Sequence, residues 1–141
     1  NVTRCLNFGT PDLELTKSYD IAAAVVADML NLVKEGVKFS AILEQMKVSY
    51  SSHGVPAGWK QHFPGGVTGY VLAEGRCETD LKITKWQAYD WYATMPGIMV
   101  EDLTIFGENG LEFASYGEKW PTRIYGNLND GYRLPEMLLL K

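Results

Sequence analysis

The residue with the clearest chemical potential is His62, one of only two histidines in the chain. It lies in the segment 61–66, whose sequence QHFPGG ends in two glycines. Glycine lets the backbone and neighbouring side chains approach a ligand closely, so an imidazole here could meet a bound molecule. The alternative is a loop histidine that is satisfied by a backbone carbonyl, and residue type alone favours that alternative.

Glu101 and Asp102 form the second candidate, because two adjacent acids follow Gly97 at the head of a predicted strand. Successive side chains of a strand point to opposite faces, so one carboxylate could enter a cleft while the other faces solvent. Adjacent acids are also common on protein surfaces, where they need no specific role. The pair alone does not establish a site.

Several kinds of catalysis lack the residues they require. The sequence contains no GxSxG, P-loop, HExxH or GxGxxG motif, which argues against serine hydrolases and nucleotide-binding proteins. Cys5 or Cys77 could in principle pair with His53 or His62, but two distant thiols without metal-ligand spacing are more typical of reduced core residues. Nucleophilic cysteine catalysis is therefore not favoured.

Charge and hydropathy argue against two classes of partner. The formal net charge is −4 and no cluster of Lys and Arg stands out, so no nucleic-acid partner is expected. The longest apolar run, residues 137–140, is far too short to cross a bilayer, so no membrane association is expected. A cytoplasmic location is the default expectation.

The first half of the chain predicts a short strand and two helices. Alternation over residues 2–6 indicates the strand, and apolar residues then recur at helical spacing over residues 16–35. Ser40 is expected to cap the second helix, and Gly36 and Gly54 are expected at the helix ends, where glycine adopts the left-handed conformation at low cost.

The second half predicts mainly strands. Residues 53–75 are rich in glycine and indicate an irregular loop that leads into a short strand at 68–72. Further strands are expected at residues 81–92, 99–106, 111–115 and 138–141, with the Asn109-Gly110 pair as a hairpin signal. The expected fold is a single α+β domain over residues 1–141, with two helices packed on a curved, mainly antiparallel sheet.

Taken in order, these motifs resemble one family. The run NVTR at residues 1–4, the pattern HxxGGxxGY at 62–70, Trp91, Gly97 and the Glu101-Asp102 pair are similar to the M24 metallopeptidases: creatinase, prolidase and methionine aminopeptidase. The Xaa-Pro peptidase-like branch is the most similar, since it also has a closing Trp-Pro-Thr like that at 120–122. The resemblance covers nearly the whole chain and implies a pita-bread fold. It further implies a C-terminal fragment, without the first strands of that fold.

The resemblance also implies a set of site residues. The family holds two metal ions with two Asp, one His and two Glu, and a bridging water attacks the peptide carbonyl. His62 matches the metal-binding histidine and Glu101 the last glutamate, whereas Asn1 and Tyr92 stand where an aspartate and the other glutamate are expected. The remaining aspartate would lie upstream of residue 1. The implied substrate pocket contains Gly65, Gly66, Gly69, Tyr70 and Trp91.

Charge balance argues against two metal ions in this chain. Two divalent ions about 3.5–4 Å apart need several carboxylates to neutralise them. Among the matched positions only Glu101 brings a full negative charge, since asparagine is neutral and a tyrosine loses its proton only near pH 10. Asp90 lies on the same strand face as Tyr92, so a single ion held by His62, Glu101 and Asp90 remains conceivable.

Two hypotheses follow. The first is a degraded metal site in a domain that is inactive as this chain and whose cleft binds a short peptide, a small molecule or a protein partner. The second is an active metal-dependent Xaa-Pro aminopeptidase or dipeptidase that uses Mn, Co or Zn when a longer parent protein supplies the missing ligands. An open sheet edge also makes a homo-oligomer plausible.

Overall fold

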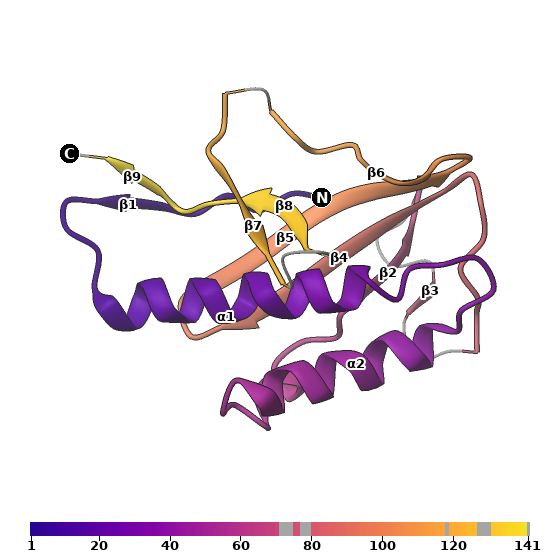
Figure 1. The fold of residues 1–141 in the computed structure, drawn as a ribbon, viewed down its shortest axis with the longest axis horizontal. Coiled ribbons are helices and arrows are strands. Elements are labelled where there is room, and N and C mark those ends of the chain that lie inside the picture. The colour runs from indigo at the N-terminus through magenta and orange to yellow at the C-terminus, as the bar shows by residue number, and fades with distance from the viewer. Residues whose placement is uncertain (71–74, 77–79, 118, 127–130, 141) are drawn as a thin grey trace.

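The structure is a computed structural model that describes residues 1–70, 75–76, 80–117, 119–126 and 131–140. It contains two α-helices, a short 3₁₀-helix η1 (Gly58–Lys60) and a set of strands, so the predicted α+β class is confirmed. One helix lies across one face of the long β4–β5 pair, and the other packs beside the first (Figure 1). The strands are β1 (Leu6–Phe8), β2 (Gly65–Thr68), β3 (Gly75–Arg76), β4 (Gln87–Met95), β5 (Ile98–Gly107), β6 (Gly110–Phe113), β7 (Thr122–Tyr125), β8 (Tyr132–Pro135) and β9 (Leu138–Leu140).

Helix α1 (Leu13–Leu30) begins three residues before the predicted start, because Asp12 caps it. The Asp12 carboxylate accepts a hydrogen bond from the backbone N–H of Glu14 at 3.0 Å, which satisfies one of the free donors of the first turn. The helix ends at Leu30, with Asn31 as its C-cap, short of the predicted residue 35. Its buried stripe forms much of the core and contains Tyr19, Ile21, Ala22, Ala23, Val25, Val26, Ala27, Met29 and Leu30.

Helix α2 (Phe39–Ser52) packs beside α1. Ser40 was expected to cap it, and that prediction is wrong: Lys38 occupies the cap position and makes no side-chain hydrogen bond there. The predicted end is correct, because Gly54 follows the terminal residue with φ at +79°.

The main sheet has the order β3-β2-β4-β5-β6, and all its neighbours are antiparallel. The predicted hairpin at Asn109-Gly110 is confirmed, since Gly107 at the end of β5 pairs with Gly110 at the start of β6. The predicted strand at 68–72 is wrong in its bounds, because β2 ends at Thr68 and residues 69 and 70 form a bend. Residues 71 and 72 of that prediction lie outside the described residues.

The face of the sheet that meets the helices is set by the aromatic residues of β4. The rings of Tyr89 and Trp91 both contact the ring of Phe39 in α2, with centroids 5.8 and 6.1 Å apart. The indole N–H of Trp91 donates a 2.9 Å hydrogen bond to the hydroxyl of Thr104, so its one polar group is satisfied in the core. Because side chains alternate along a strand, Asp90 and Tyr92 point to the opposite, open face.

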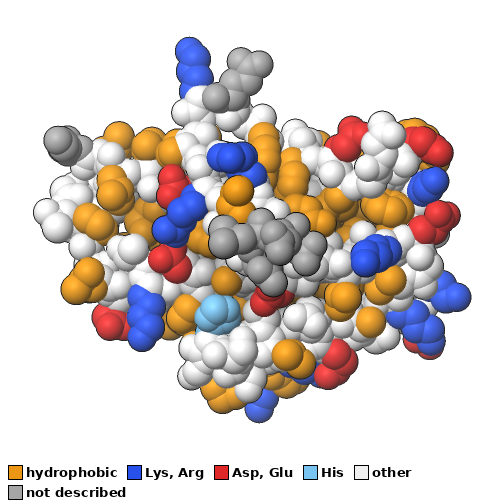
Figure 2. Space-filling view, in the orientation of Figure 1, with side chains coloured by type: hydrophobic (Ala, Val, Ile, Leu, Met, Phe, Trp, Pro, Cys, Tyr) orange, Lys and Arg blue, Asp and Glu red, His pale blue; other side chains and the backbone are white. Residues whose placement is uncertain are grey.

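Two small sheets complete the fold. β1 pairs in parallel with β9, so the first and last strands lie side by side, and β7 forms a hairpin with β8 near α1 (Figure 1). The β7–β8 hairpin was not predicted. In the view of Figure 2, acidic and basic side chains are interspersed and form no single-sign patch. Among the described residues, neither helix is both long and apolar enough to cross a bilayer.

Candidate functional site

The open face of β4 and β5 brings the predicted metal-site residues together. Tyr92 lies directly opposite Glu101 in the register of the two strands, and Asp90 lies opposite Leu103. Directly opposed residues of an antiparallel pair share a face, so all four side chains project from the side that the helices do not cover. Glu101 is 6% exposed and Asp90 is 1% exposed, which makes this an acidic pair with little solvent contact.

Glu101 is held by the N-terminal segment. The hydroxyl of Thr3 donates a 2.5 Å hydrogen bond to its carboxylate, and the backbone N–H of Thr3 donates to the Glu101 carbonyl at 3.3 Å. Thr3 thus fixes both the side chain and the backbone of Glu101. Sequence reasoning had passed over this threonine, because its only signal is its place in the NVTR run.

Asp102 faces the other way and is not exposed to solvent, which corrects the expectation for the second acid of the pair. It is 1% exposed and accepts 2.7 Å hydrogen bonds from Arg4 and from the Ser115 hydroxyl. Burial raises the pKa of the Asp102 carboxyl, while the hydrogen bonds from Ser115 and Arg4 act in the opposite direction. Asp102 is therefore part of the support behind the open face.

Arg4 joins the N-terminal segment to β5. One guanidinium nitrogen donates to Asp102 at 2.7 Å and to the carbonyl of Ser115 at 3.0 Å. The other donates to the carbonyls of Thr3 at 2.8 Å and Glu101 at 3.2 Å. Since these bonds reach both Thr3 and Glu101, Arg4 sets the position of the Thr3 hydroxyl against the Glu101 carboxylate without reaching the open face itself.

Asp90 is the most unusual group of the site. In its ionised form both carboxylate oxygens are buried without a hydrogen-bond partner among the described residues. Burial is the largest cause that raises the pKa of Asp90, the charge and side chain of Glu101 raise it as well, and the α-amino group of Asn1 lowers it. The net result is a pKa of about 7. Protonated Asp90 can therefore donate a hydrogen bond to the Glu101 carboxylate.

Asp90→Asn is expected to remove a loss of stability at high pH. The pKa of Asp90 is about 7 in the folded protein, against an ordinary value of 3.8. The stability that comes from the folded state holding this proton is therefore fully present below about pH 4 and is lost as the pH rises through 7. The full shift corresponds to at most about 4 kcal/mol. The variant should therefore be more stable than wild type by roughly 1–3 kcal/mol at pH 8 and nearly equal to it at pH 4.

Urea unfolding at pH 4, 6 and 8 measures this effect. Asp80→Asn is the matched control, because the Asp80 side chain is exposed and its removal should give the same small change at each pH. A stability difference between Asp90→Asn and wild type that does not vary with pH would contradict the expectation.

His62 contacts aromatic rings. Its ring meets that of Tyr92 edge-on with centroids 4.8 Å apart, and it lies 5.0 Å from the ring of Phe63. Phe63 and Tyr92 also meet, at 5.4 Å. The Tyr92 ring thus contacts His62 and projects from the position directly opposite Glu101, where the family resemblance would place a glutamate.

The glycine segment contributes in two ways. Gly65 and Gly66 belong to β2 and pair with Trp91 and Asp90 of β4. Further along, Gly69 and Tyr70 line a cavity of about 310 Å³ on the open face, together with Asn1, Thr68, Ala88 and Leu103. The predicted pocket residues Gly69 and Tyr70 therefore border a real cavity, and Asn1 borders it as well.

Trp91 was expected in the substrate pocket, and the structure places it elsewhere. It is fully buried on the helix-facing side, stacked on Tyr89 with ring centroids 5.6 Å apart. Alternation along β4 explains the difference, because Trp91 lies between Asp90 and Tyr92 and must point away from the face they share. Its role is to support the strand behind the site.

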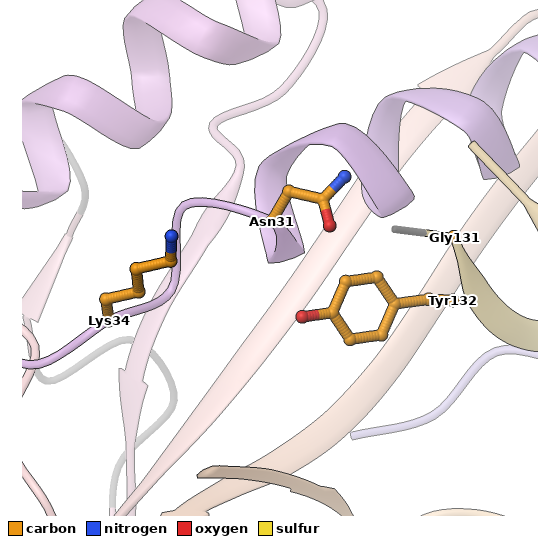
Figure 3. A pocket seen from close by; sticks show the side chains of 4 residues that line it. All are labelled: Asn31, Lys34, Gly131 and Tyr132. Carbon is orange, nitrogen blue, oxygen red and sulfur yellow. The ribbon is translucent and has the colours of Figure 1, made fainter. Parts of the chain in front are cut away.

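Two larger cavities lie away from these residues. One of about 510 Å³ at the end of α1 is lined by Asn31, Lys34, Gly131 and Tyr132 (Figure 3). The other, about 650 Å³, lies between α1 and β7 and includes His53. None of the residues predicted to bind metal or substrate lines either cavity, so the open face of β4 and β5 remains the candidate site.

The residues of this face do not fit a pair of divalent metal ions. Among the described residues, no three His, Cys, Asp or Glu side chains come together as a metal-binding group. Asp90 and Glu101 supply two carboxylates, while Asn1 is neutral and Tyr92 presents a phenol. His62 and Glu101 therefore remain predicted ligands, and Asp90 with Asn1 and Tyr92 remain further candidates.

Comparison with known proteins identifies the fold. No protein-family model matches the sequence, and no curated protein matches it. Among solved structures, a dipeptidase from Pyrococcus horikoshii OT3 superimposes with a TM-score of 0.76 at 17% identity, and dipeptidase PepE from Mycobacterium ulcerans with 0.73 at 16%. A Xaa-Pro dipeptidase from Bacillus anthracis gives 0.70 at 19% identity.

These matches cover 99% of this chain, and between 35% and 37% of the length of the matched structures. The chain therefore has the pita-bread fold of these dipeptidases, over about a third of their length. The resemblance inferred from the motifs is confirmed at the level of the fold.

Proposed function

We propose that this domain is a Xaa-Pro-peptidase-type pita-bread domain with a degraded metal site, which binds a short peptide or small molecule and does not hydrolyse peptides as this chain. The observation that carries the proposal is the place of Tyr92. Its ring packs edge-on against His62 and projects from the position opposite Glu101, where a dinuclear site would need a carboxylate.

Charge supports the same proposal. Two divalent ions carry four positive charges, and each carboxylate that is missing from the site leaves part of the repulsion between the ions uncompensated. Asp90 and Glu101 supply at most two negative charges on this face, and only one when Asp90 is protonated. The cavity lined by Gly69, Tyr70 and Leu103 supplies the binding surface.

The alternative is a metal-dependent hydrolase completed by a longer parent protein. The similarity to structures described as dipeptidases and prolidases favours it. In that case His62, Glu101 and Asp90 would hold Mn, Co or Zn, which would polarise the scissile carbonyl and activate a water. The two proposals differ in metal content and in hydrolysis.

The test measures both properties on the purified chain. After incubation with Mn²⁺, Co²⁺ or Zn²⁺ and desalting, elemental analysis should find well under one ion per chain, and a Xaa-Pro dipeptide should remain intact. Roughly two ions per chain together with hydrolysis would overturn the proposal.

Tyr92→Glu gives a sharper version of the same test. A third carboxylate beside Asp90 and Glu101 should create metal affinity, so Mn²⁺ or Zn²⁺ should raise the Tm of this variant by several degrees above its own metal-free value. Wild type and the neutral control Tyr92→Gln should show no such rise. A metal-dependent rise of equal size in all three proteins would mean that Tyr92 does not block the site.

A further inference from the structure

The backbone of β7 presents half of its hydrogen-bonding groups away from β8. In an antiparallel ladder every second residue bonds to the partner strand, and the residues between them point their backbone groups to the opposite edge. The N–H of Glu136 donates to the carbonyl of Pro121 at 2.8 Å, so Pro121 and, two residues on, Arg123 bond to the β8 side. The N–H and C=O groups of Thr122 and Ile124 therefore point to the outer edge of β7.

The two outer edges of this hairpin differ. At β8 the hydroxyl of Tyr19 donates to the carbonyl of Pro135 at 2.8 Å, and the hydroxyl of Tyr116 donates to the carbonyl of Arg133. Pro135 also has no N–H to offer. Among the described residues β7 pairs with β8 alone, and no hydrogen bond reaches its outward N–H groups. The hairpin is therefore closed by side chains on its β8 edge and open on its β7 edge.

A cavity of about 650 Å³ lies along the open edge, where β7 crosses α1 (Figure 1). Leu13, Ile21 and Ala24 of α1 line one side of it, and Ile124 and Gly126 line the other, whereas no described residue of β8 does. Leu13 is 84% exposed and Ile124 is 47% exposed, so apolar side chains on both sides face solvent. An extended chain beside β7 would place alternate side chains over this apolar surface of α1.

The ionised groups of this cavity are unevenly paired. Arg123 forms ion pairs with two acids, Asp20 and Glu136, so its charge is already compensated. Lys17 also lines the cavity, and it has no ion-pair partner among the described residues. The charge that the cavity can still accept from outside is therefore negative.

The position of Lys17 along β7 follows from two contacts. Arg123, near the start of the strand, pairs with Asp20, and a Cβ at Gly126, just after its end, would lie 3.3 Å from that of Ala27. The strand therefore runs along α1 in the direction of the helix. Lys17 precedes Asp20 by one helical turn, so it lies beside the start of β7.

We propose that the outer edge of β7 is a docking site for an extended peptide segment of another protein, which adds to it as an antiparallel strand. Outward N–H and C=O groups at strand spacing are matched by another strand. The inward side chains of the peptide are apolar where they cover α1, and the one beside Lys17 is acidic. This site shares no residue with the cavity on the open face of β4 and β5, so a partner can bind here while a ligand occupies that face.

The probe is the capped peptide Thr-Val-Thr-Val-Thr-Glu, whose valines would face α1 and whose glutamate would lie beside Lys17. It is titrated into the isotope-labelled chain, and amide shifts and hydrogen exchange are followed by NMR. We expect shifts at Lys17, and exchange at Thr122 and Ile124 that is at least about fivefold slower near saturation. The amides of Arg123 and Tyr125 already bond to β8, so their exchange should change little.

A modified peptide and two variants serve as controls. N-methylation of the second and third threonines keeps every side chain but removes the two N–H groups that face Ile124 and Thr122, so binding should weaken about tenfold or more. Lys17→Gln should weaken binding about two- to fivefold, but only for the peptide with glutamate and not for its glutamine analogue. Lys82→Gln changes an exposed lysine outside the cavity and should leave both affinities unchanged.

Four results would overturn the proposal. Three of them are no binding of the probe, equal binding of its N-methylated form, and shifts confined to the open face of β4 and β5. The fourth is slower exchange at Ile124 as the protein concentration rises without peptide, because a second copy of this chain would then cover the edge.

Discussion

Gly65→Ala is expected to destabilise the domain by more than about 4 kcal/mol, enough to leave it largely unfolded at 37 °C. A Cβ at this position would lie 1.8 Å from the carbonyl oxygen of Asp90 and 3.0 Å from the Cα of Trp91. Both contacts are with backbone atoms of the paired strand β4, which cannot move without breaking the sheet. The φ of +111° adds strain for any residue with a side chain.

Chemical denaturation and the far-UV circular dichroism of the purified variant measure this effect. Gly117→Ala is the matched control, because a Cβ there meets nothing within 4 Å and should change stability by less than about 0.5 kcal/mol. If Gly65→Ala folds with a stability within about 1 kcal/mol of wild type, the close approach of β2 to β4 is not as described.

Gly65 shows how far the sequence could lead and where it stopped. The glycine-rich segment predicted a close backbone approach, and the structure has one. The sequence placed that approach against a substrate, whereas Gly65 makes room for the carbonyl of Asp90 across the sheet. Local composition indicates that space is needed, but the partner that needs it lies 25 residues away and becomes visible only in the register of β2 with β4.

The helices and the central hairpin could be predicted because their signals are local. Apolar spacing within α1 and α2 and the Asn109-Gly110 turn act over a few residues. The parallel pairing of β1 with β9 and the β7–β8 hairpin were missed, since short strands carry little periodicity and their partners are distant. The buried role of Asp102 was missed for the same reason, because its partner Arg4 lies at the other end of the chain.

That partnership leads to the second large effect. Asp102→Ala is expected to destabilise the domain by about 3–5 kcal/mol, because it leaves the mostly buried guanidinium of Arg4 without its carboxylate. It also removes the nearer acceptor of the Ser115 hydroxyl and leaves it only the Leu103 carbonyl at 3.3 Å. Removing one partner of a buried ion pair lowers the stability by more than the intact pair contributes to it, because the desolvation penalty of the remaining charge is no longer compensated.

A double-mutant cycle separates these terms. Arg4→Met leaves the buried charge of Asp102 unpaired, whereas the double variant Arg4→Met/Asp102→Ala has no unpaired charge. The loss of stability in the double variant should therefore be smaller than the sum of the two single losses by at least about 1.5 kcal/mol. Asp80→Ala breaks the exposed pair with Lys38 and should cost less than about 1 kcal/mol. Additive single changes would mean that Arg4 and Asp102 do not act as a pair. In that case the N-terminal segment would be held against β5 mainly by the Thr3–Glu101 backbone bond and by the bonds from Arg4 to carbonyl oxygens, and the position of Thr3 against Glu101 would not depend on Asp102.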